Sequence, residues 1–201
     1  MRRFYALSLA LVSLFLLPGV ASAHGRFGAT DLMYIPTSGT LAEDAYGFYL
    51  NFSSGLTVLG GDVGILPDLE LGATVLVHEE WQSASLRAKY HLLREKRDGF
   101  GLAVGVQDVG DGLFSPYVVA GKTLAPTLQG YLGIGGGGMD GIFFGLSKTM
   151  AALRGAVVFV EYDSHRLNLG GRFKLEENLG LDVGLIGLER AAIGLSYLGR
   201  F

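Results

Sequence analysis

The chain has 201 residues, of which 49% are apolar, 17% are charged and 32 are glycine, whereas an average soluble chain has roughly 25% charged residues. This composition excludes an intrinsically disordered protein, and the absence of cysteine excludes disulfide frameworks and cysteine-ligated metal or iron–sulfur sites. The formal net charge of −3 argues against a nucleic-acid-binding protein.

Residues 1–23 have the features of a secretory signal peptide. Arg2 and Arg3 precede an apolar run over residues 4–17, and small residues at 21–23 follow at the spacing of a cleavage site. The run is shorter than the roughly 20 residues that a membrane helix needs, and no stretch of 18 apolar residues comes later. We therefore expect export and no helical anchor. Cleavage would remove two of the 16 basic residues and leave 14 against 19 acidic ones.

Residues 24–45 show no regular alternation, and we interpret them as a leading, periplasmic segment before the first strand. From about residue 46 the side-chain type changes at every second position, which is typical of β-strands. The pattern is clearest over residues 166–175. There, Arg166, Asn168, Gly170, Arg172 and Lys174 alternate with Leu167, Leu169, Gly171, Phe173 and Leu175.

Turn residues such as Pro67-Asp68, Gly110-Asp111-Gly112 and Glu176-Glu177-Asn178 divide this region into short alternating runs. The runs predict twelve strands, near residues 46–53, 56–65, 69–78, 83–92, 99–107, 113–123, 128–135, 140–148, 155–163, 166–174, 179–187 and 191–200. Short links imply antiparallel hairpins, and strands of roughly ten residues can cross a bilayer at a tilt. The sequence therefore predicts an all-β fold, an antiparallel transmembrane β-barrel over residues 46–201. An even number of strands would place both termini on the periplasmic side.

A soluble sandwich or a periplasmic lipid- or ligand-binding barrel would also alternate, but with the apolar face inside. The low charge, the aromatic chain end at Phe201 and the small residues on the polar face favour the membrane barrel, because small residues make a poor apolar core. These small residues are Gly101, Ala103, Gly105, Gly133, Gly135, Gly145, Gly180 and Gly184. We expect the barrel in the outer membrane, with outer-membrane lipid around it.

Several segments, taken in order, resemble the YjbH-like outer-membrane proteins that are linked to exopolysaccharide production. They are the segment from Gly28 to Phe48, Leu66 to Gly72, Val104 to Asp111, Tyr117 to Lys122, Glu161 to Asp163, Asn168 to Gly170, and the end at Gly194, Tyr197 and Phe201. Gly121 stands where the family pattern has serine, and this chain is much shorter than the large members. The resemblance implies an outer-membrane barrel with an accessory role in exopolysaccharide production or export. It also implies that Gly194, Tyr197 and Phe201 act as a signal for the outer-membrane barrel assembly machinery.

The inner face of the predicted barrel carries charges of both signs. The expected lumen-lining residues are Arg87, Lys89, His91, Glu161, Asp163, Asn168, Arg172 and Lys174. Glu161 and Asp163 would neutralise inward arginine and lysine groups, and such bridges would partly plug the lumen. Twelve strands lie between the side-chain-filled eight-stranded barrels and the open sixteen-stranded porins, so we expect a narrow or occluded pore.

No motif in the sequence indicates catalysis or cofactor binding. Gly133, Gly135 and Gly138 match a dinucleotide-binding pattern, but a strand rather than a helix follows them. No pair of the four histidines has metal-ligand spacing. We therefore expect no cofactor and no enzymatic activity. Three hypotheses stay open: an accessory of exopolysaccharide production whose lumen contacts hydroxylated or acidic sugars, a passive narrow pore or structural outer-membrane protein, and a periplasmic ligand carrier.

Overall fold

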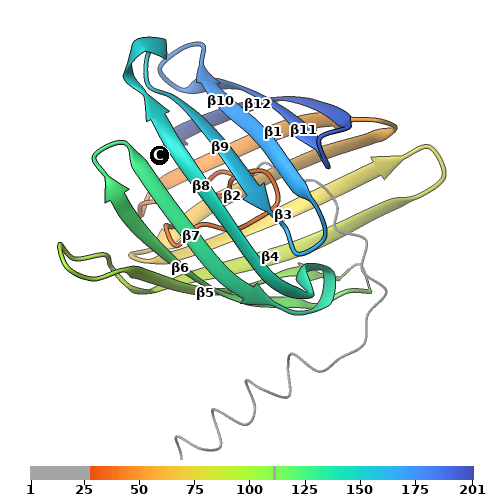
Figure 1. The fold of residues 1–201 in the computed structure, drawn as a ribbon. Coiled ribbons are helices and arrows are strands. Elements are labelled where there is room, and N and C mark those ends of the chain that lie inside the picture. Colours follow the sequence, from red (N-terminus) through yellow and green to blue (C-terminus); the bar gives the residue numbers. More distant parts are fainter. Residues whose placement is uncertain (1–27, 111) are drawn as a thin grey trace, which may run out of the picture.

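The computed structural model describes residues 28–110 and 112–201, so the predicted signal peptide lies outside the described residues. Twelve antiparallel strands close into a single barrel, in which each strand pairs with its neighbours in sequence and β1 pairs with β12 (Figure 1). The strands are β1 (Ala45–Ser53), β2 (Leu56–Leu66), β3 (Leu69–His78), β4 (Gln82–Leu93), β5 (Gly101–Val109), β6 (Ser115–Ala125), β7 (Leu128–Gly135), β8 (Gly141–Met150), β9 (Ala156–Tyr162), β10 (Leu167–Lys174), β11 (Leu179–Ile186) and β12 (Arg190–Arg200). Two short 3-10 helices, η1 (Gly137–Met139) and η2 (Ala151–Leu153), lie in the connections after β7 and β8.

The predicted fold class is confirmed, and every strand begins and ends within two residues of its predicted position. The agreement follows from the turn residues that interrupt the alternation. In the two-residue link between β2 and β3, Asp68 has a φ of 72°, a left-handed conformation that aspartate tolerates better than most residues. Gly55, with a φ of 79°, closes the link between β1 and β2 in the same way.

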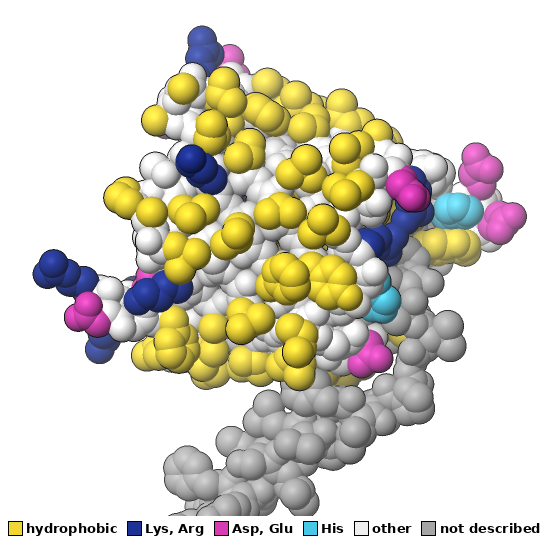
Figure 2. Space-filling view, viewed as in Figure 1, with side chains coloured by type: hydrophobic (Ala, Val, Ile, Leu, Met, Phe, Trp, Pro, Cys, Tyr) yellow, Lys and Arg dark blue, Asp and Glu magenta, His cyan; other side chains and the backbone are white. Residues whose placement is uncertain are grey.

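The side chains of the barrel are polar inside and apolar outside. On β10, Asn168 is fully buried, whereas its neighbours Leu167 and Leu169 are 41% and 47% exposed. Figure 2 shows apolar side chains spread over the outer wall, with charged groups gathered toward the two ends of the barrel. This sidedness is that of a transmembrane β-barrel and the reverse of a soluble one. Among the described residues no helix has the length and apolar character needed to span a membrane.

Residues 28–44, here called the plug, enter the lumen, where Figure 1 shows a loop encircled by strands. Residues 28–41 are buried or partly buried, whereas residues 42–44 are exposed and lead to β1. The plug turns back on itself through a bridge between Asp31 and Pro36, and its tip residues Met33 and Ile35 are fully buried. The segment leads into β1 as expected, and β1 begins one residue earlier than predicted. The segment was expected outside the barrel in the periplasm, and its position inside the lumen corrects that expectation.

The small residues on the inner face provide space for the plug. A Cβ atom added to Gly184 would lie 1.9 Å from the Cε of Met33, and one on Gly145 would lie 2.7 Å from Ile35. At Gly64 it would lie 2.0 Å from the backbone oxygen of Ala42. Interiors are close-packed, so a larger side chain at these positions would collide with the plug. The glycine-rich inner face is therefore complementary to a lumen that is filled by the chain's own segment.

Candidate functional site: the plugged lumen

The plug is attached to one wall of the barrel through Asp31. The Asp31 carboxylate lies between two inward cations of β4: its Oδ2 is 3.0 Å from Nη1 of Arg87, and its Oδ1 is 3.0 Å from Nζ of Lys89. Burial raises the pKa of Asp31, but the charges of Lys89 and Arg87 outweigh this effect and hold that pKa below its usual value. Asp31 is therefore ionised at neutral pH and forms two buried ion pairs with the wall.

Two acidic residues of the same wall complete this attachment. Asp62 on β2 pairs with Arg87, with a distance of 2.7 Å from Nε to Oδ1 and a second contact through Nη2. It also accepts a hydrogen bond of 3.0 Å from the backbone amide of Ala29. Glu70 on β3 accepts hydrogen bonds from the Thr30 hydroxyl, at 2.8 and 3.0 Å, and from the backbone amide of Leu41, at 2.8 Å. Both carboxylates therefore connect the plug to a cation of the wall. Asp62 does so through its pair with Arg87, and Glu70 lies 3.7 Å from Nζ of Lys89.

The opposite wall holds the tip of the plug through Glu161 on β9. Its fully buried carboxylate accepts hydrogen bonds from three successive backbone amides: Met33 at 3.0 Å, Tyr34 at 2.8 Å and Ile35 at 3.5 Å. Asn168 on β10 donates a fourth, at 3.1 Å. The prediction that Glu161 neutralises inward arginine or lysine does not match these contacts, because its described partners are amide groups. Backbone amides leave no mark in the sequence, so this role could not be predicted.

Asp163 and Asn168 support Glu161 from the same wall. The Asn168 amide donates to Asp163 at 3.0 Å, and its oxygen accepts a bond of 2.9 Å from the backbone of Gly187. Asp163 lies 3.4 Å from Nε of Arg166, as expected for a carboxylate that neutralises a cation. The guanidinium of Arg166 in turn lies 5.5 Å above the ring of Tyr34, whose pKa is raised by burial to about 12. Tyr34 is therefore neutral and adds a cation–π contact to the plug.

Apolar packing fixes the tip of the plug between these two walls. The plug contributes Leu32, Met33 and Ile35 to a buried cluster inside the barrel. The barrel contributes Ala103, Tyr117, Val119, Met139, Phe143, Phe159, Ile186 and Ala192. The aromatic members point inward opposite glycines: a Cβ on Gly133 would lie 2.2 Å from the Phe143 ring. The lumen therefore contains an apolar zone that sequence alternation alone did not distinguish from the polar lining.

The remaining predicted lumen residues lie closer to the end of the barrel where the chain terminates. Arg172 pairs with Asp182 at 2.6 Å and donates to the Gly28 carbonyl at 3.3 Å. His91 faces inward, with Nδ1 3.8 Å from Asp68. Lys174 shares the inward parity of Arg172 but is exposed, because it is the last residue of β10 and lies at the rim.

The three residues predicted to form the assembly signal lie on β12 and at the chain end. Gly194 faces inward against Asn51, whereas Tyr197 and Phe201 are 39% and 85% exposed. The Phe201 ring lies 4.8 Å and the Tyr197 ring 6.2 Å from the ring of Tyr46 on β1. These rings form an exposed aromatic cluster at the seam where the barrel closes. Their role as an assembly signal stays a prediction.

Comparison with known proteins identifies solved structures with a similar fold. No protein-family model and no curated protein matches the sequence. Among solved structures, the chain is similar to the KdgM porin with a TM-score of 0.59 and 15% identity, over 76% of this chain and 98% of that one. A structure of the KdgM porin in complex with disordered oligogalacturonate matches with a TM-score of 0.58, the same identity and the same coverage. The barrel has a porin-like fold.

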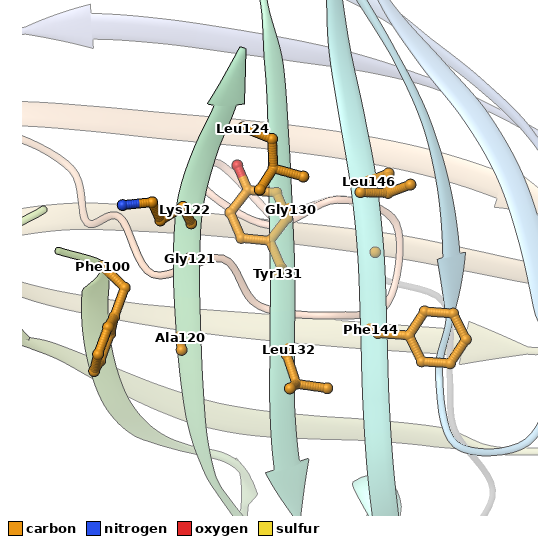
Figure 3. A pocket seen from close by; sticks show the side chains of 11 residues that line it. Phe100, Ala120, Gly121, Lys122, Leu124, Gly130, Tyr131, Leu132, Phe144 and Leu146 are labelled. Carbon is orange, nitrogen blue, oxygen red and sulfur yellow. The ribbon is translucent and has the colours of Figure 1, made fainter. Parts of the chain in front are cut away.

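Outside this porin-like lumen, the described residues form a shallow groove of about 410 Å³ on the outer wall over β6 to β8 (Figure 3). Ala120 and Gly130 make the wall thin there, and Leu132, Phe144 and other apolar side chains surround the hollow. Its apolar lining is that of the rest of the outer face. The described residues hold no group of three or more His, Cys, Asp or Glu that could bind a metal ion. The lumen is therefore the candidate site, and its chemistry is ion pairing and hydrogen bonding.

Proposed function

We propose that the protein is a non-enzymatic outer-membrane β-barrel that acts as a passive narrow pore, closed in the described state by its own plug. The observation that carries this proposal is a polar lumen occupied by a segment that is covalently continuous with β1 but held inside by hydrogen bonds and ion pairs. Of the hypotheses drawn from the sequence, the pore agrees best with this geometry and with the porin-like fold.

The outer surface supports placement in a membrane. Large apolar side chains that are 36% exposed or more occur on ten of the twelve strands, all except β5 and β9, and include Phe48, Leu59, Leu132 and Ile193. Soluble monomers rarely expose contiguous apolar patches larger than a few hundred Å². The same sidedness opposes the periplasmic carrier, whose apolar face would line the cavity. Outer-membrane lipid and the barrel assembly machinery are therefore the partners that we propose.

The plug enters the barrel from the end that carries the C-terminus. The backbone amide of Phe201 donates to the Asp44 carbonyl at 3.0 Å, and this contact fixes the base of the plug at that rim. With an even number of strands, we assign this rim to the periplasmic side. Displacement of the plug would then occur toward the periplasm, with residues 28–44 leaving the lumen while β1 stays in the sheet.

The contacts of the plug are of a reversible kind. A net hydrogen bond contributes about 0.5–1.5 kcal/mol, and one to a charged group about 1.5–3 kcal/mol. The plug is held by a limited number of such bonds and by three apolar residues at its tip. When the plug leaves, water can enter the opened lumen and hydrogen-bond to the charged groups on both walls, so these groups are not left without partners.

An accessory role in exopolysaccharide production is the second candidate function. It is supported by the resemblance to YjbH-like proteins and by the fact that a porin of similar fold was solved in complex with oligogalacturonate. A plugged lumen is compatible with this role when a sugar chain displaces the plug.

A disulfide lock tests the pore. A Cβ atom on Gly47 would lie 2.9 Å from the Cβ of Ala29, so the plug must move outward by roughly 0.6 Å to reach the 3.5–4.5 Å of disulfides. The chain has no cysteine of its own. The double variant Ala29→Cys/Gly47→Cys would tie the plug to β1. In planar bilayers we expect no openings when it is oxidised and openings after reduction, with Ala29→Cys alone insensitive to the reductant. Absence of openings in the reduced double variant and in the wild type would show that the barrel is structural rather than a pore.

A further inference from the structure

The contacts of Thr30 and Asp31 resemble those of a bound ligand. The two residues present a hydroxyl and a carboxylate side by side to the wall of the lumen. Lys89 contacts both groups, at 3.0 Å from Asp31 Oδ1 and through a hydrogen bond to the Thr30 hydroxyl. Glu70 accepts a hydrogen bond from that hydroxyl. Together the two side chains have the functional groups of a hydroxycarboxylate.

The wall side of this contact exists independently of the plug. Arg87 already uses Nε and Nη2 on Asp62, so its position is set within the barrel and only Nη1 points to Asp31. Both wall cations are more than nine-tenths buried: Arg87 is 9% and Lys89 3% exposed. Removal of Asp31 would leave Asp62 beside Arg87 and Glu70 beside Lys89, but Nη1 of Arg87 and Nζ of Lys89 would lose the carboxylate that they both bind. A solute carboxylate can take the place of Asp31.

The charge of the lumen singles out this point on the wall. Within ranges 28–110 and 112–201, Arg87 and Lys89 are the buried basic side chains. The buried acidic ones are Asp62, Glu70, Asp108, Glu161, Asp163 and Asp182. Arg166 and Arg172 also face the lumen, but they are partly exposed and pair with Asp163 and Asp182. The two enclosed cations therefore lie together at one place, and a carboxylate is bound there in the closed state.

We propose that Arg87, Lys89 and Glu70 form a binding site for a hydroxylated carboxylate solute, such as a uronic acid, and that Thr30 and Asp31 occupy this site while the plug is in place. Arg87 and Lys89 bind the carboxylate, and Glu70 accepts a hydrogen bond from a hydroxyl group on a neighbouring carbon of the solute. The solute and the plug then compete, so binding of the solute favours the unplugged barrel. This inference rests on the proposed function in one respect, since the plug must be able to leave the lumen.

Binding to the full-length protein in detergent tests the site. The probe is glucuronate, and glucose is the matched control because it has the ring hydroxyls without the carboxylate. A short tether gives the plug an effective concentration in the millimolar range. We therefore expect the double variant Thr30→Ala/Asp31→Ala to bind glucuronate at least tenfold more tightly than the wild type, with no binding of glucose. Adding Lys89→Met should abolish that gain, whereas Lys122→Met, an outward lysine on β6, should preserve it.

A second measurement needs no change in the site. In the variant Met33→Cys, whose cysteine replaces a fully buried side chain, glucuronate should accelerate labelling by a thiol reagent and glucose should not. Equal effects of the two sugars, or a glucuronate affinity that is the same with Lys89→Met and with Lys122→Met, would overturn the site. These outcomes are separate from the pore: glucuronate binding by a barrel that never conducts refutes the pore alone, and conductance without glucuronate binding refutes the site alone.

Discussion

Replacing Glu161 with glutamine should release the tip of the plug. In the wild type Oε2 accepts from the amides of Met33 and Ile35, and Oε1 accepts from Tyr34 and Asn168. In glutamine one of these oxygens becomes an NH₂ group, which faces two N–H donors whichever way the side chain is turned. Two charge-assisted bonds are lost, at about 1.5–3 kcal/mol each, and part of this loss is offset because a buried charge is removed. We expect the plugged state to lose about 2–4 kcal/mol.

Each 1.4 kcal/mol changes an equilibrium tenfold, so the population of the released plug should rise by a factor of about 30–1,000. The assay is the rate at which a cysteine in the variant Met33→Cys reacts with a thiol reagent, compared with and without Glu161→Gln. Lys174→Gln is the control, because Lys174 lies at the rim and should not affect the rate. If Glu161→Gln leaves labelling as slow as in the control, Glu161 does not hold the plug and the reasoning is refuted.

Three further predictions concern the rim, the acid dependence and the outer face. Gly64→Ala should loosen the base of the plug by about 1–3 kcal/mol, since its Cβ would lie 2.0 Å from the Ala42 oxygen; unchanged labelling of Met33→Cys would contradict the close approach. The lowered pKa of Asp31 means that its ion pairs stabilise the plug above the ordinary value of 3.8 and are lost as the pH falls through the lower pKa of the folded state. Openings in planar bilayers should therefore increase below pH 3.8 in the wild type and show a smaller acid step in Asp31→Asn; an equal step in both would assign it to another group. Leu169→Arg should destabilise the barrel in vesicles by about 2–4 kcal/mol in urea unfolding, whereas a value near zero would indicate that Leu169 does not face lipid.

The barrel could be predicted from the sequence because its two determinants are local. Alternation of side chains assigns Leu167 and Leu169 to one face and Asn168 to the other, and turn residues such as Asp68 mark where the chain reverses. Composition then predicts which face of each strand points into the barrel, because the glycine-rich polar face cannot form an apolar core. For this reason the strand boundaries and the inward direction of Arg87, Lys89 and Glu161 agree with the structure.

The plug could not be predicted, because its contacts are non-local and partly made by the backbone. Glu161 binds three amides that any sequence would present, and Asp31 pairs with residues more than 50 positions away. The signal that was present is indirect. Inward glycines such as Gly145 and Gly184 are unnecessary in a water-filled pore, and they indicate that a further segment packs against the wall. Lys174 was predicted to line the lumen but is exposed at the rim. Alternation predicts the face of a strand to which a residue belongs, but not whether the last residue of the strand is enclosed.

The most direct test of the account is an NMR measurement on the protein in lipid nanodiscs with labelled methionine methyl groups. The chain has four methionines, so the resonances are few. Met33 and Met139 are 0% and 5% exposed inside the lumen, and Met150 lies at the end of β8 near the rim. Met33 and Met139 should be protected from both a water-soluble and a lipid-dissolved paramagnetic agent, while Met150 is broadened. Broadening of Met33 by the water-soluble agent as strong as that of Met150 would show that residues 28–44 lie outside the barrel and would contradict the plugged lumen.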